Sequence, residues 1–197
     1  ILMEQQRDRA RAAQKKEIIS VSSLSSGAMT EFIGFERLSV TATVTEVVEE
    51  KKRISIVLDR SPFYAEMGGQ VGDTGTLSIG GKKWTVTGTQ KAGDAFLNFI
   101  KGDGVPEVGG EVELAVDAAR RASIQRHHTV THLFHWALHE VTSPEASQKG
   151  SYVGPDKLTF DFNSPALTPQ QLADIEQLVN ERIVDNSVVS WAEAPYS

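Results

Sequence analysis

The residues of this chain with the most obvious chemical potential are its histidines. All five lie within the thirteen positions 127–139 of a 197-residue sequence. Wound at ~100° per residue, four of them (His128, His132, His135 and His139) fall within an arc of about 60°. Apolar residues gather on the other side of the same winding: Val130, Leu133, Phe134, Ala137 and Val141. We therefore predict an amphipathic helix over roughly 117–141, with imidazole rings as its polar stripe.

Two of these histidines have the spacing of metal ligands. His128 and His132 are four residues apart, so their rings lie one above the other on a helix and could hold a single ion. The three residues between them are Thr-Val-Thr, which leaves no glutamate as the base of a zinc protease. Two imidazoles leave a tetrahedral zinc half-coordinated, and Asp161, Glu66 or water could complete the site. The alternative is an ordinary helix whose histidines face solvent.

A glycine-rich stretch, "SPFYAEMGGQVGDTG" at 61–75, is the second unusual feature. Its four glycines (Gly68, Gly69, Gly72 and Gly75) would let the backbone approach a ligand closely. A phosphate cradle does not fit, because no Gly-Lys-Ser/Thr follows and the carboxylates of Glu66 and Asp73 would repel phosphate. The alternative is a β-turn with a bulge. The chain also has no Gly-x-Ser-x-Gly motif, which removes the nucleophile elbow of serine hydrolases.

The elements around these two motifs predict an α+β fold. From about 38 to 116, β-branched segments alternate with a period of two and are joined by glycine turns such as Gly80-Gly81. This pattern favours a small β-barrel-like subdomain over 28–116. An α+β subdomain with an antiparallel sheet follows over 117–197, truncated before its natural end. It contains the histidine helix, an irregular stretch with Pro144 and Gly150, and two strands, "LTFDF" and "VVSWAEA".

Two helices complete the expected organisation. The stretch "TPQQLADIEQLVNERIVDN" has Thr168 as N-cap, Pro169 at the first helical position and Gln171 three residues after the cap. Its buried face should consist of Leu172, Ile175, Leu178, Val179 and Ile183. Residues 1–27 read as a polar helix followed by a Ser-rich linker. The start without methionine and the end after a strand-like stretch suggest a piece of a longer protein.

Composition narrows the function further. A formal net charge of −6 argues against a generic DNA or RNA binder. Basic residues cluster at 51–53 and at Arg120, Arg121 and Arg126, and each is expected to be solvated. No apolar run reaches the roughly 20 residues that cross a bilayer, and the absence of cysteine excludes disulfides and thiolate ligands here. We expect a soluble, cytoplasmic protein.

Together, "FYAEMGGQVGDTG" and "HTVTHLFH" resemble the paired motifs of the alanyl-tRNA synthetase family, in its internal editing domain and its free-standing editing relatives. The downstream segments "SQKGSYV", "LTFDF" and "LADIEQLVNERIVDN" are also similar to that family. The opening "EQQRDRARAAQKK" resembles the helix that enters the editing domain from the tRNA-recognition region. Two positions depart from the pattern: Met67 replaces a serine, and His127 replaces an asparagine.

The resemblance implies an editing hydrolase for the ester of mischarged Ser-tRNA(Ala) or Gly-tRNA(Ala). It makes His128 and His132 zinc ligands, joined by a Cys-x-x-x-His expected beyond residue 197. It also implies that Gln148 is the catalytic residue, which fixes substrate or water. The implied substrate contacts are Thr131, Gln148, Ser151, Gly68, Gly69 and Gln70. The partner would be the tRNA(Ala) acceptor end, with no membrane or DNA. ATP and magnesium would belong only to a catalytic domain absent from these residues.

Two other functions stay open from the sequence. One is a tRNA-binding or scaffold module, in which the glycine stretch and the histidine helix have no catalytic role. The other is a zinc hydrolase that acts on a different small ester or amide. A preference for the seryl over the alanyl ester would separate editing from tRNA binding. Dependence on an intact tRNA acceptor end would exclude a zinc hydrolase that acts on another small ester or amide.

Overall fold

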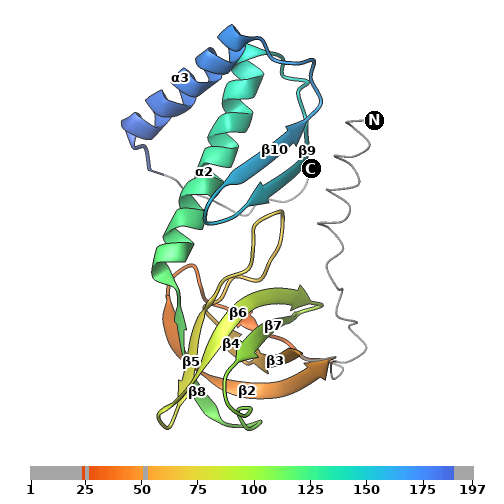
Figure 1. Cartoon of the computed structure of the whole chain (residues 1–197), viewed down its shortest axis with the longest axis vertical. Coiled ribbons are helices and arrows are strands. Elements are labelled where there is room, and N and C mark those ends of the chain that lie inside the picture. The colour runs from red at the N-terminus through yellow and green to blue at the C-terminus, as the bar shows by residue number, and fades with distance from the viewer. Residues whose placement is uncertain (1–23, 25–26, 51–52, 189–197) are drawn as a thin grey trace.

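The computed structural model describes residues 24, 27–50 and 53–188. It has a β-barrel at one end, from which a long helix runs to a smaller group of elements at the other end (Figure 1). A loop between two barrel strands, gold in Figure 1, rises from the barrel toward that smaller group. The histidine helix and the glycine stretch therefore both lie where the two parts of the molecule meet.

Six strands close the barrel, in the order β2-β3-β7-β6-β5-β8, and every neighbouring pair is antiparallel. The alternation of β-branched and polar residues predicted these strands, and the predicted barrel is confirmed. The Gly80-Gly81 turn joins β5 to β6 with φ of 54° and 81°, as a two-residue hairpin turn requires. The bounds are β2 Ser39–Glu50, β3 Arg53–Leu58, β5 Gly75–Ile79, β6 Lys82–Ala92, β7 Ala95–Lys101 and β8 Glu111–Val116.

The barrel interior is filled by inward-facing aliphatic and aromatic side chains. Phe63, Ile56, Leu58, Leu77 and Leu114 are among the largest fully buried ones. A short parallel pair, β1 (Glu31–Phe32) with β4 (Arg60–Ser61), lies beside the barrel and leads the chain into the glycine stretch. The core thus fixes the position from which this stretch leaves the barrel.

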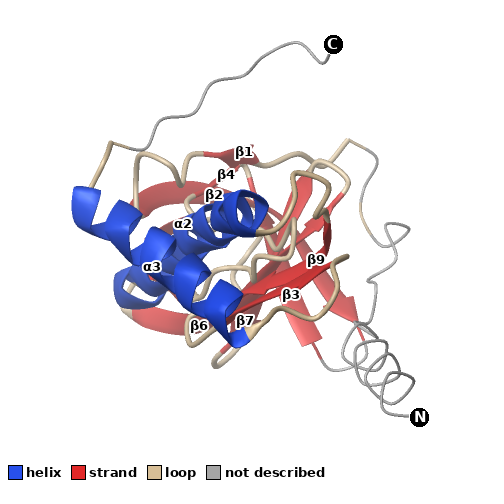
Figure 2. Cartoon of the chain, turned by 90° about the horizontal axis from the view of Figure 1, so that it is seen from above, coloured by secondary structure: helices blue, strands red, loops and turns tan. Residues whose placement is uncertain are grey.

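Helix α2 (Ala118–Val141) carries all five histidines, as predicted. Asp117 caps its start by accepting a hydrogen bond of 3.0 Å from the backbone N–H of Arg120. The predicted apolar face packs in one cluster against α3 and the β9–β10 hairpin, with Ala137 fully buried; Leu138, which the prediction did not include, is also fully buried there. In the view of Figure 2, α3 crosses α2 on one side and β9 lies on the other.

The segment after α2 differs from the prediction in one element. Residues 148–153, expected to be irregular, form strand β9 (Gln148–Val153), which pairs antiparallel with β10 (Leu158–Phe162). This stretch is polar and contains Gly150, so its own propensity for a strand is low. Pairing with β10, which the sequence had identified as a strand, supplies the hydrogen bonds that make it one.

Helix α3 (Pro169–Asp185) has the predicted capping box, in which Thr168 and Gln171 each accept from the other's backbone N–H. Its buried face is narrower than predicted. Ile175 and Val179 are buried, whereas Leu172 and Ile183 are 52% and 49% exposed, because only one side of the helix reaches α2. The predicted N-terminal helix, and the strand "VVSWAEA" from residue 189 on, lie outside the described residues.

Candidate functional site

The tip of the glycine stretch is a tight hairpin turn. Met67 and Gln70 exchange backbone hydrogen bonds of 3.2 and 3.0 Å. Between them, Gly68 and Gly69 have φ of 60° and 85°, the pair of positive values that a type I′ turn needs. The β-turn alternative for this stretch is therefore correct for its tip. We call residues 66–73 the glycine loop.

The glycine loop docks on the edge of strand β9. Val71 donates its backbone N–H to the carbonyl of Val153 (3.0 Å), and Val153 donates to the carbonyl of Gly69 (2.9 Å). A Cβ at Gly69 would lie 2.5 Å from the carbonyl oxygen of Ser151 and 2.8 Å from its hydroxyl oxygen. Only glycine allows this approach. The close backbone contact that the glycines were expected to make with a ligand is, at Gly69, made with Ser151.

The docked loop brings Gln70 to the histidine helix. The Gln70 side chain is buried, and its Oε1 lies 2.6 Å from Nδ1 of His128. With Nδ1 as the donor, the lone pair of His128 stays on Nε2, where a metal or substrate could use it. The ring of His132 lies 5.0 Å from that of His128, tilted by 38°.

The electrostatics favour a neutral His128. Burial, and secondarily the nearby charge of His132, lower the pKa of the His128 imidazole below its ordinary value. A neutral imidazole is the form that binds a metal or accepts a proton. The arrangement at His128 is thus suited to either role at pH 7.

One neighbour of His128 ties this half of α2 to β9, and a second bonds within the helix. Nδ1 of His127 lies 2.6 Å from the carbonyl oxygen of Gly154, directly after β9. Thr131 is buried, and its hydroxyl donates to the backbone carbonyl of His127 at 2.8 Å. The Thr131 hydroxyl therefore keeps only its acceptor lone pairs for a substrate.

The four histidines of the stripe do not share the one polar face that their spacing suggests. His128 and His132 lie beside the glycine loop, whereas His135 and His139 pack under the β9–β10 hairpin and its connection. His135 packs against Phe160 with 5.2 Å between ring centroids, and its buried Nε2 has no hydrogen-bond partner among the described residues. His139 Nε2 lies 2.6 Å from the carbonyl oxygen of Ala146. Because the β9–β10 hairpin and its connection cover this half of α2, these two rings belong to the packing there.

A buried ion pair anchors the glycine loop to the start of α2. The Arg121 guanidinium contacts both carboxylate oxygens of Asp73 and also donates to the carbonyls of Gly34 (2.9 Å) and Pro62 (2.8 Å). The side chains of Arg121 and Asp73 are 6% and 1% exposed. The expectation that Arg121 is solvated is therefore wrong. A buried arginine needs several acceptors, and the fold gathers them from separate segments.

The other predicted site residues lie as follows. Gly68 is at the exposed tip of the glycine loop, and Ser151 is half-buried on β9 beneath Gly69. Gln148 is exposed at the first position of β9. Among the hydrogen bonds of the described residues, none joins its side chain to His128 or Gln70. The sequence missed the contact of His127 with Gly154, since nothing in the local pattern reports a carbonyl 27 residues away.

The donor set fits half of a zinc site. His128 and His132 offer two imidazoles, and Gln70 orients the first of them as an outer partner would. Within the described ranges, no group of three or more His, Cys, Asp or Glu side chains could hold a metal. Asp161 and Glu66, the two carboxylates considered from the sequence, therefore do not complete the pair there.

Comparison with known proteins identifies the class. Residues 1–120 match the family described as tRNA synthetases class II (A), and the chain belongs to that family. Over its whole length it is 46% identical to an alanine–tRNA ligase of Akkermansia muciniphila, of which it covers 21%. It is also 43% identical to the enzyme of Methylacidiphilum infernorum, with 99% of the chain and 20% of that protein aligned. The chain thus spans about a fifth of the length of these relatives.

Among the helices in the described part of the chain, none reaches both the length and the hydropathy of a membrane span.

Proposed function

We propose that this chain is the editing part of an alanine–tRNA ligase, which hydrolyses the ester between serine or glycine and tRNA(Ala). One observation carries the proposal: the fold joins the glycine loop and the histidine helix through the contact of Gln70 with His128. The two motifs are far apart in the sequence, yet they contribute to one place. The similarity to alanine–tRNA ligases supports the choice of tRNA.

The chemistry of alanine selection gives such a site a purpose. A pocket shaped for alanine cannot exclude the smaller glycine, and it rejects an added hydroxyl only by about 10²-fold. A second, hydrolytic site can recognise the seryl hydroxyl that the first tolerates. Small polar groups of the kind found at Thr131 and Ser151 suit that recognition.

The reaction is attack of water on the ester carbonyl. The bond from the carbonyl carbon to the ribose oxygen breaks, the ribose oxygen takes a proton, and free serine or glycine leaves. His128 and His132 would hold zinc, which when bound would supply Lewis-acid polarisation and orientation of the substrate. The chain's own residues would position the reactants: Gln70 fixes the His128 ring, and Gln148 would hold substrate or water.

The proposal is tested by deacylation of Ser-tRNA(Ala), with Ala-tRNA(Ala) as control substrate. We expect cleavage of the seryl ester alone, increased by zinc and abolished by a chelator. The matched variants are His128→Ala and His139→Ala on the same helix. The first should abolish cleavage, whereas the second should leave it unchanged in protein that remains folded. Equal treatment of both esters would refute editing.

One observation favours a second candidate, a tRNA-binding or scaffold module without catalytic activity. Only two metal-ligating side chains meet at the site in the described part of the chain. Binding of tRNA(Ala) without any zinc-dependent cleavage would support this alternative.

A further inference from the structure

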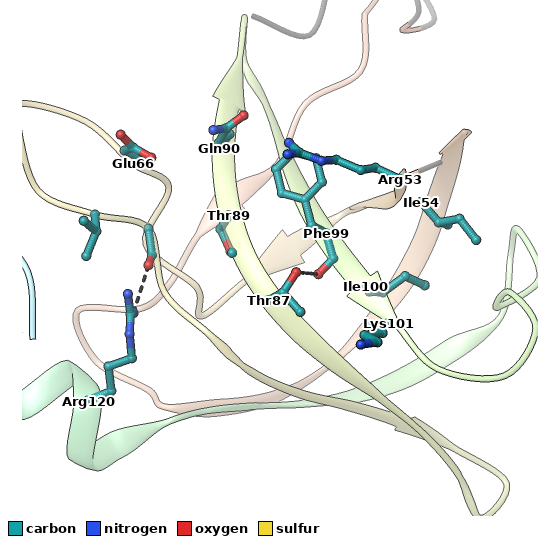
Figure 3. Close-up of a pocket in the computed structure, with 13 residues that line it drawn as sticks. Arg53, Ile54, Glu66, Thr87, Thr89, Gln90, Phe99, Ile100, Lys101 and Arg120 are labelled. Carbon is teal, nitrogen blue, oxygen red and sulfur yellow. Dashed lines mark hydrogen bonds between the residues drawn. The ribbon is translucent and has the colours of Figure 1, made fainter. Parts of the chain in front are cut away.

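A groove of about 530 Å³ lies on the outside of the barrel, across strands β3, β7 and β6 (Figure 3). At one end it reaches the glycine loop at Glu66 and Gly72 and the first turn of α2 at Arg120. None of the residues assigned to the editing site lines it. The groove is therefore a separate surface that leads to the loop carrying Gln70.

The groove is cationic in an otherwise acidic chain. Arg53, Lys101 and Arg120 line it together with a single carboxylate, Glu66, which gives three positive charges against one negative, or +2. The whole chain has a formal net charge of −6. Arg53 and Arg120 come from two basic clusters that are far apart in the sequence, and the fold brings one member of each to the same groove. Such local positive charge attracts a polyanion.

The groove also contains an aromatic ring. Phe99 on β7 is half-buried, and the guanidinium carbon of Arg53 lies 6.0 Å from its ring centroid. Aromatic rings and guanidinium groups are the side chains on which unpaired bases stack. An unpaired base can stack on such a half-buried ring, whereas a paired base is already stacked within its duplex, so the combination favours a single strand.

The floor of the groove lacks a side chain at Gly88. This residue lies at the β-bulge between Val86 and Gly88, where β6 shifts its register with β7. A Cβ built at Gly88 would meet no atom within 4 Å, and its φ is not in the left-handed region. Neither a steric clash nor a positive φ requires glycine at this position. The missing side chain leaves this part of the groove unfilled.

The groove is connected to the candidate site by a direct contact. Nη1 of Arg120 donates to the carbonyl of Gly72 at 2.9 Å, so this cation is held beside the glycine loop (Figure 3). Two residues before Gly72, Gln70 contacts His128. A strand that follows the groove past Arg120 would thus arrive at the loop that forms one wall of the site.

We propose that this groove binds the single-stranded 3′ end of an RNA, with phosphates on Arg53, Lys101 and Arg120 and a base stacked at Phe99. The proposal rests on the proposed function, in that the RNA is the acceptor end of the tRNA whose ester is cleaved. A protein partner fits less well, because the apolar residues of the groove (Ile54, Val71, Phe99 and Ile100) are interspersed with cations, hydroxyls and two glycines and form no broad apolar patch.

The test is fluorescence anisotropy with a labelled single-stranded RNA of about eight nucleotides that ends in CCA. We expect the logarithm of affinity to fall with the logarithm of salt with a slope of about −2, as three phosphate contacts on a single strand predict. Gly88→Glu fills the groove with a repelling carboxylate and should weaken binding about tenfold or more. Phe99→Leu keeps the apolar packing and removes the ring, and should weaken it about fivefold or more.

The matched control is Ala115→Glu. It places the same new charge at an exposed position on β8, on the opposite side of the barrel. This variant should bind the RNA as the original chain does. Circular dichroism and thermal unfolding of each variant show whether it remains folded.

The outcomes separate the groove from the editing activity. Loss of RNA binding in Gly88→Glu and Phe99→Leu, but not in Ala115→Glu, supports the groove even if no seryl ester is cleaved. Equal binding by all four proteins, or no binding by the original chain, overturns it. If the seryl ester is still cleaved in that case, the proposed function stands and only the groove is wrong.

Discussion

The buried ion pair between Arg121 and Asp73 offers the sharpest test of how the glycine loop is held. Replacing Arg121 by Met removes the guanidinium and leaves a carboxylate that is 1% exposed. The Asp73 carboxylate then keeps the backbone N–H of Tyr64, at 2.7 Å, as its only donor among the described contacts. The carbonyls of Gly34 and Pro62 also lose a donor.

The expected cost is large because a buried charge is left uncompensated. Breaking such a pair by removing one partner destabilises proteins by about 3–5 kcal/mol. For a chain of this length, that corresponds to a fall in Tm of roughly 8–15 °C. Urea unfolding followed by circular dichroism measures the change in the free energy of unfolding.

The matched control is Arg60→Met, which breaks the exposed pair of Arg60 with Asp59. Their side chains are 49% and 33% exposed, so we expect a loss under about 1 kcal/mol. In the double variant, Arg121→Met with Asp73→Asn, the orphaned charge is gone. The double variant should therefore lose less than the sum of the two single losses. Equal costs for Arg121→Met and Arg60→Met, or strict additivity, would refute the reasoning.

Three further predictions concern the loop, the site and the last helix. Gly81→Ala should lower the free energy of unfolding by roughly 1–2 kcal/mol, because alanine is strained at its φ of 81°. Gly69→Ala, at a φ of 85°, should lower it clearly more, because the new Cβ would also displace Ser151. Urea unfolding of both variants measures the difference. An NMR titration should place the pKa of His128 below 6.5, because burial disfavours its cation. The stabilisation from neutral His128 is then complete above pH 6.5 and is lost as the pH falls through the lowered pKa; a value above 6.5 would contradict this. Thr168→Ala should lose about 1 kcal/mol with the capping box, and an unchanged Tm would argue against the cap.

Local patterns predicted most elements because their causes are local. The β-branched alternation of the barrel strands and the glycine turn at 80–81 act between near neighbours in the chain. The caps at Asp117 and Thr168 each involve a residue three positions away. Strand β9 could not be found in this way, because its hydrogen bonds come from β10 and the glycine loop.

The site was predictable in its composition and not in its arrangement. The spacing of His128 and His132 placed both rings together, as the structure shows. The roles of these residues as zinc ligands, and of Thr131, Gln148 and Ser151 as substrate contacts, stay predictions. Helical periodicity could not show that His135 is packed against Phe160, because a helical wheel contains no information about what covers each face.

By itself, the sequence determined most of the elements, with β9 as an exception, their order along the chain and the two motifs that indicate chemistry. Those features depend on side-chain size, polarity and spacing over a few residues. The tertiary structure decided which groups meet: Gln70 with His128, Arg121 with Asp73, and Arg53 with Phe99 in the groove that Arg120 also lines. Such contacts join positions dozens of residues apart. They depend on barrel closure and on the docking of the glycine loop to β9, which no local pattern contains.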